Sequence, residues 1–165
     1  MILSRFLKPK LQPTTSEARQ SALQELESTD PALAEIARQD ADPMRRRAAL
    51  ERLADLDLLQ TIAHEDADPA MQTAAQDRYQ ALLAGKIAES PMLTERLKRL
   101  QHNPDPALAR FLAHHAAEPE LRRAALTLID AETMLADIAA HDSHPEVRLA
   151  ALERVHKPNL LDQIA

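Results

Sequence analysis

The sequence predicts an all-α protein built as a stack of helical hairpins, and three observations support this. Eleven prolines stand against a single glycine, a ratio that fits helices joined by proline-started corners better than β-turns, which need residues that accept positive φ. A phrase that begins at Asp30 returns almost unchanged at Asp105. The apolar residues within that phrase recur at helical spacing.

The first repeated unit reads Pro-x-x-Arg-x-x-Ala-Leu-x-x, followed by Leu, Ile or Val. Its apolar residues lie at i, i+1 and i+4, which forms one stripe on a helix but alternates between the two faces of a strand. The unit therefore predicts helices, here called A helices. They are expected at Pro43, Pro119 and Pro145, with a serine-started copy at Ser16 and a degenerate copy at Pro69.

The second repeated unit, Leu-x-x-Ile-Ala, predicts B helices with an i, i+3, i+4 stripe. Its copies begin at Leu33, Leu59, Leu135 and Leu161, with a variant at Leu108. Each B helix follows an A helix closely, so we expect it to fold back on that A helix as an αα-hairpin. Repeat arginines in neighbouring copies lie 26 or 27 residues apart, and such a period is typical of a solenoid.

The residues before the helix-starting prolines are expected to cap the helices. Proline at the first helical position has its φ preset and no N–H to leave unpaired. A preceding Asp or Ser accepts hydrogen bonds from the first turn. We expect such caps at Asp30, Asp42, Asp68, Ser90 and Asp105. Glu118, His144 and Lys157 keep the following proline without the better cap.

Three segments depart from the repeat. Residues 1–15 are basic and apolar and are expected to cap the first hairpin, with a weak membrane or partner anchor as the alternative. Residues 16–165 hold the repeats, with an irregular part near 85–104. There Gly85 is expected to stop a helix, and a helix capped by Ser90 is expected to run to Gln101. Its predicted buried side is Met92, Leu93, Leu97 and Leu100.

The last B stripe, Leu161, Ile164 and Ala165, ends without a polar cap. Ends of repeat stacks normally need such a cap. We therefore expect a continuation of the chain, a partner or a second copy to cover this C-terminal repeat face.

The two repeated units together resemble HEAT repeats, of the short HEAT-like kind found in many bacterial scaffolds and in bilin lyases. The segments RFLKPK and RYQALLAGK add a resemblance to the N-terminal HEAT-like region of a bacterial family of unassigned function. The resemblance implies a right-handed αα-superhelix, a non-enzymatic protein-binding role, and B helices that line the concave side. It brings no active site to transfer to this chain.

This resemblance implies a partner-binding row just after the B stripes, formed by Arg38, Gln39, His64, Glu65, His114 and His141. Its mixed polarity suits a protein or peptide, whereas nucleic acid demands clustered positive charge and the chain carries a net charge of −6. We therefore expect no nucleic-acid partner. The alternative is that these residues are ordinary solvated helix ends.

The repeat arginines allow a second interpretation. Arg19, Arg46, Arg122 and Arg148 are expected to pair with loop carboxylates such as those of Asp42 or Asp66, and the alternative is an anion-binding or nucleic-acid-binding row.

Enzymatic alternatives find little support in the sequence. HEAT-like deoxyhypusine hydroxylases bind iron through repeated His-Glu pairs, and this chain has one, His64-Glu65. A lyase-type enzyme, as among the bilin lyases, is a further alternative, but no specific residue pattern supports it. HEAT-like DNA glycosylases need a cationic groove with aromatic residues, but this acidic chain has no Trp and one Tyr. We predict no catalytic residue, metal site or cofactor. The absence of cysteine fits a reducing compartment and no segment is apolar enough to span a membrane, so a cytoplasmic location is expected.

Overall fold

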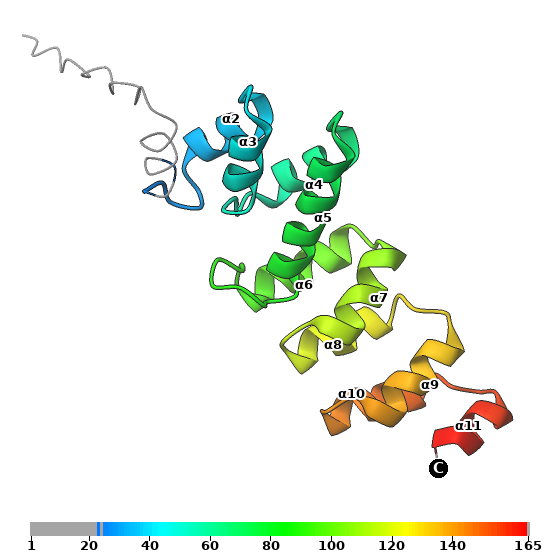
Figure 1. The fold of residues 1–165 in the computed structure, drawn as a ribbon. Coiled ribbons are helices and arrows are strands. Elements are labelled where there is room, and N and C mark those ends of the chain that lie inside the picture. Colours follow the sequence, from blue (N-terminus) through cyan, green and yellow to red (C-terminus); the bar gives the residue numbers. More distant parts are fainter. Residues whose placement is uncertain (1–22, 24, 165) are drawn as a thin grey trace, which may run out of the picture. The chain divides into compact units, whose positions relative to one another are not determined.

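The computed structural model describes residue 23 and residues 25–164 (Figure 1). Every regular element within those residues is an α-helix, which confirms the all-α prediction. None of the described helices is both long and apolar enough to cross a membrane. The chain divides after Asp55 into two compact units. The expected N-terminal cap of residues 1–15, Arg19 and Ala165 lie outside the described residues.

The first compact unit contains helices α2 (Pro31–Gln39) and α3 (Pro43–Leu50), which pack against each other. Its core is aliphatic: Leu33 and Leu50 are completely buried. The Arg52 guanidinium ties the end of this hairpin to the preceding segment, since Nη2 donates to the Leu26 carbonyl at 2.6 Å.

The second compact unit contains eight helices among its described residues. They are α4 (Leu56–Glu65), α5 (Pro69–Leu83), α6 (Leu93–His102), α7 (Pro106–His115), α8 (Pro119–Leu126), α9 (Glu132–His141), α10 (Pro145–Leu152) and α11 (Pro158–Ile164). The most extensive pairings join α4 to α5, α7 to α8, and α9 to α10. The B helices α4, α7 and α9 therefore pair mainly with the A helix that follows each of them.

This pairing corrects the expectation that a B helix folds back on the A helix before it. A B helix is joined to the next A helix by a corner of three residues, such as 142–144, whereas five residues, such as 127–131, lead from A to B. The tighter corner holds its two helices together, and hydrogen bonds described below fix it.

Successive hairpins stack like on like at the end of the second unit. Helix α10 packs on α8 as well as on α9, and α11 packs on α9 (Figure 1). The irregular segment in the middle behaves differently, because α6 packs on α8 and α5 packs on α7. Helix α6 thus takes the place on α8 that an A helix of the preceding hairpin would take.

The predicted aspartate caps are confirmed. The side chains of Asp30, Asp42, Asp68 and Asp105 each accept a hydrogen bond, 2.8 or 2.9 Å long, from the backbone N–H two residues further on. Each cap satisfies an N–H group that the helix itself leaves unpaired.

The predicted cap at Ser90 is wrong. Helix α6 begins at Leu93 and runs to His102, so Ser90 lies outside its first turn. Arg96 Nε donates to the Pro91 carbonyl at 2.9 Å, which holds residue 91 in the preceding corner. Met92, expected on the buried side, is 76% exposed, whereas Leu100 is buried as predicted.

Gly85 does stop a helix, as the sequence predicted. Helix α5 ends at Leu83, and Gly85 follows with φ of +72°. The Gly85 N–H donates to the Leu82 carbonyl and the Lys86 N–H to the Ala81 carbonyl, both at 3.2 Å. This is the Schellman arrangement of helix ends, which favours glycine because other residues are strained at positive φ.

Candidate partner-binding site

The repeat arginine fixes the corner between a B helix and the next A helix. In each described A helix with a repeat arginine, or with glutamine in its place, the side chain donates to the carbonyl six residues earlier. The donor and acceptor pairs are Arg46 to Asp40 at 3.2 Å, Gln72 to Asp66 at 2.7 Å, Arg122 to Ala116 at 2.9 Å and Arg148 to Asp142 at 2.9 Å. The acceptors lie at the ends of the B helices, where carbonyls lack partners within the helix.

Arg122 also binds a carboxylate, as the sequence predicted for this class of arginine. Its Nε and Nη2 donate to the two carboxylate oxygens of Asp142 at 2.8 and 3.0 Å. Asp142 lies in the corner of the following hairpin, between α9 and α10. The bidentate pair therefore links two successive hairpins, and little of either side chain is exposed.

A second arginine–carboxylate pair, in which the arginine is buried, was not predicted from the sequence. Arg96 is 4% exposed, and its Nη1 and Nη2 donate to the two oxygens of Glu118 at 2.8 and 2.5 Å. Glu118 precedes α8 in the corner of the next hairpin, so this pair repeats the arrangement of Arg122 and Asp142. The sequence could have indicated this pair, because Leu93, Arg96 and Leu100 have the same spacing as Pro, Arg and Leu in the A unit.

Both carboxylates have depressed pKa values. Hydrogen bonding to the Arg96 guanidinium lowers the pKa of Glu118 despite partial burial. Burial alone would raise the pKa of Asp142, but hydrogen bonds from Arg122 and from the His144 N–H outweigh it and the pKa is lowered. Both groups therefore stabilise the fold in their charged forms.

These shifts predict a loss of stability in acid. Because each folded pKa lies below the unfolded value of about 4, the stabilisation is complete above about pH 5 and disappears as pH falls through the folded pKa values. Urea unfolding followed by circular dichroism between pH 7 and pH 3 measures this. Asp142→Asn should weaken the dependence, and an unchanged profile in that variant would contradict the assignment.

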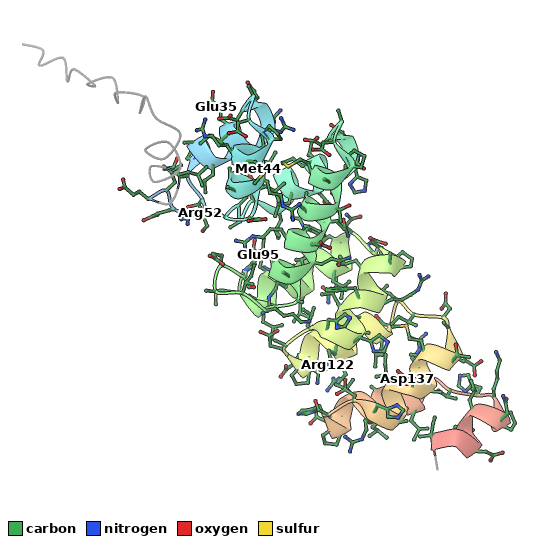
Figure 2. The ribbon with its side chains drawn as sticks, in the orientation of Figure 1. Glu35, Met44, Arg52, Glu95, Arg122 and Asp137 are labelled. Atoms are coloured by element: carbon green, nitrogen blue, oxygen red, sulfur yellow. The ribbon has the colours of Figure 1, made fainter. Side chains whose placement is uncertain are left out.

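A hollow of about 230 Å³ lies beside the Arg122–Asp142 pair. Its lining consists of His114, Arg122, Asp137, Ile138, His141, Asp142 and Ser143. Figure 2 marks Arg122 on α8 and Asp137 on α9. The His141 ring is oriented by its own helix, because Nδ1 lies 3.0 Å from the Asp137 carbonyl oxygen and 3.1 Å from its carboxylate. The hollow therefore presents imidazole and carboxylate groups beside a guanidinium that is already paired.

The structure brings two of the six predicted row residues to this hollow, His114 from α7 and His141 from α9. His64 and Glu65 are exposed at the end of α4 and do not line it. Arg38 and Gln39 are exposed at the end of α2, in the first compact unit. All six occupy the last turn of a B helix, as the repeat predicted.

The described histidines and carboxylates do not form a ligand cluster. Within residues 23 and 25–164, no group of three or more His, Cys, Asp or Glu side chains is arranged to hold a metal ion. The exposed rings of His64, His102 and His141 instead face carbonyls one turn earlier, at 2.7 to 3.0 Å.

Comparison with known proteins returned no family model, no curated protein and no solved structure that matches this chain.

Proposed function

We propose that this chain is a non-enzymatic scaffold, a right-handed stack of short HEAT-like hairpins that binds a protein or peptide. Support comes from the stacking of α8 on α10 and of α9 on α11, which are copies of the same two repeated units. We also retain the cytoplasmic location, the concave position of the B helices and the resemblance to a bacterial family as predictions from the sequence.

The observation that carries this proposal is the hollow between His114 and His141. Its lining offers imidazole and carboxylate groups, which together can donate and accept hydrogen bonds. This suits the mixed donors and acceptors of a polypeptide. Anion binding at Arg122 is less well supported, because every nitrogen of its guanidinium already donates within the protein. A phosphate at that position competes with the Asp142 carboxylate.

The test is a peptide selected by display on the full chain, with its affinity measured by calorimetry. Replacing both His114 and His141 by alanine should weaken binding about tenfold, the scale of an interface residue that matters. His102→Ala is the matched control, since His102 is exposed and faces the Lys98 carbonyl as His141 faces that of Asp137. Equal losses in both variants would remove the hollow from the proposal.

The row residues outside the hollow need a different control. Reversing the charges of Arg38 and Glu65 should also weaken binding if the row acts as predicted. The control is the exposed pair Arg47 and Glu51, since exchanging the two residues keeps an ion pair on the surface.

A further inference from the structure

The exposed side of α7 carries basic side chains that no carboxylate of the same helix balances. Arg110 and His114 lie one turn apart on this side, and both are exposed. Residues 106–117, which include all of α7, contain no aspartate or glutamate. Within the described part of the chain, neither Arg110 nor His114 forms an ion pair.

The next B helix shows how the repeat can balance such a surface. Asp137 and His141 of α9 occupy the places of Arg110 and His114, 27 residues further on. The His141 Nδ1 lies 3.1 Å from the Asp137 carboxylate, so α9 supplies its own anion. Because α7 has arginine where α9 has aspartate, the corresponding carboxylate is missing from α7.

The fold adds a third basic side chain to this side of α7. Gly85 ends α5, and the Ala117 N–H donates to the Ala84 carbonyl at 2.8 Å, which holds this helix end beside the end of α7. The Lys86 ammonium lies over the Phe111 ring, 5.9 Å from its centroid. Lys86 is exposed and forms no ion pair with the residues that the structure describes.

His115 connects Lys86 to His114. Its ring centroid lies 4.7 Å from that of Phe111 and 6.2 Å from that of His114. Partial burial lowers the pKa of His115, and the nearby Lys86 and His114 lower it further. Both groups that act electrostatically on this imidazole are therefore basic. We call Lys86, Arg110, Phe111, His114 and His115 the α7 patch.

We propose that the α7 patch binds an acidic segment of the partner peptide, in which two or more aspartates or glutamates pair with Lys86 and Arg110. The inference rests on the proposed function, because His114 belongs both to the patch and to the hollow beside α9. The acidic residues lie over α7, and the rest of the peptide enters the hollow. Charge complementarity of this kind selects a partner and speeds its association.

A nucleic acid fits this surface less well than an acidic peptide. Lysine and arginine supply only two permanent charges to the patch, whereas a nucleic acid needs many clustered cations. Asp137 and Asp142 line the adjoining hollow, where a phosphate backbone would meet them and a peptide can place neutral residues. The N-terminal segment of the chain is also unsuitable, because residues 1–22 contain one acidic residue against four arginines and lysines.

The probes are fluorescent hexaglutamate and hexaglutamine peptides, whose binding to the full chain is measured by fluorescence polarisation. We expect saturable binding of hexaglutamate that weakens with added salt, and no binding of hexaglutamine. Arg110→Glu and Lys86→Glu should each weaken hexaglutamate binding about tenfold, because each places a like charge against the peptide.

Lys98→Glu is the matched control. Lys98 is exposed on α6, and its replacement changes the net charge of the chain by the same amount. It should change the affinity for hexaglutamate by less than about twofold, the scale of an exposed charge away from the contact. Circular dichroism verifies that each variant is folded.

Four outcomes overturn the inference. The first is absence of saturable hexaglutamate binding, and the second is equal losses in Arg110→Glu and Lys98→Glu. The third is a thymidine oligonucleotide that binds more tightly than hexaglutamate and is lost in Arg110→Glu, which would assign the patch to nucleic acid. The fourth is a dimer in sedimentation velocity that Arg110→Glu dissociates, which would assign the patch to a second copy.

Failure of this inference is distinguishable from failure of the proposed function. If the display-selected peptide loses affinity in the double alanine variant of His114 and His141 but not in Arg110→Glu, the hollow binds a peptide without an acidic segment and only this inference falls. If hexaglutamate binds as expected while the double variant leaves the selected peptide unaffected, the patch stands and the hollow is removed.

Discussion

Gly85→Ala is expected to destabilise the second compact unit by about 3 kcal/mol, from positive φ and a steric clash together. Gly85 has φ of +72°, and a Cβ atom there would press against Arg96 Nη1 and lie 2.9 Å from both Arg96 Cζ and Glu118 Oε2. Neither the Arg96 guanidinium nor the Glu118 carboxylate can move away easily, because the two groups are hydrogen-bonded to each other. Urea unfolding of the variant and the parent measures the loss.

A double-mutant cycle separates the two causes of this loss. In an Arg96→Ala background the clash with the guanidinium disappears, so Gly85→Ala should cost only about 1 kcal/mol, the strain of positive φ. The same cost in both backgrounds would show that the close approach to Arg96 has no energetic weight. The dense packing around Gly85 then needs another explanation.

Glu118→Ala is expected to cost about 3 kcal/mol, because it leaves a buried guanidinium without its counter-charge. Arg96 is 4% exposed and keeps only carbonyl partners, those of Leu83 and Pro91, when the carboxylate is removed. The free energy of unfolding from urea titration tests this value. The carboxylate itself is partly exposed, so Arg96→Ala should cost less than Glu118→Ala.

The control for Glu118 is a carboxylate with an exposed arginine partner. Glu146 pairs with Arg123 at 3.0 Å, and the two side chains are 66% and 51% exposed. Glu146→Ala should therefore cost no more than about 0.5 kcal/mol. If Glu118→Ala and Glu146→Ala have similar effects, the burial of the Arg96–Glu118 pair does not determine the stability of this region.

The two buried pairs explain how short helices with small aliphatic cores hold a defined stacking. Helix α8 spans Pro119–Leu126, too short to be stable by itself. Arg96 and Arg122 each join an A helix to the corner of the next hairpin, so the charged contacts specify which hairpin follows which. We infer that these pairs contribute to the order of the hairpins as well as to stability.

Local chemistry made most of the helices predictable. The apolar stripes fixed the A and B helices, and an aspartate before a proline fixed four of their starts. The predicted cap at Ser90 was wrong because it considered only the Ser-Pro dipeptide. The hydrogen bond from Arg96 to the Pro91 carbonyl holds that proline in a corner instead. The predicted pairing of helices was wrong because closeness in sequence does not show that a three-residue corner holds two helices together better than a five-residue link does.

The candidate site was predictable only as a set of positions. The repeat placed His114 and His141 at equivalent helix ends, since periodicity is a property of the sequence. Only the tertiary structure brought both to one hollow with Asp137, and only it showed that Arg122 is already paired there. The sequence by itself thus determined the helices, their caps and their stripes, because these depend on contacts a few residues apart. Which helices pair, which arginines are buried and which leucines stay exposed were decided by contacts 20 or more residues apart, such as Arg96 to Glu118, whose partners no local pattern names.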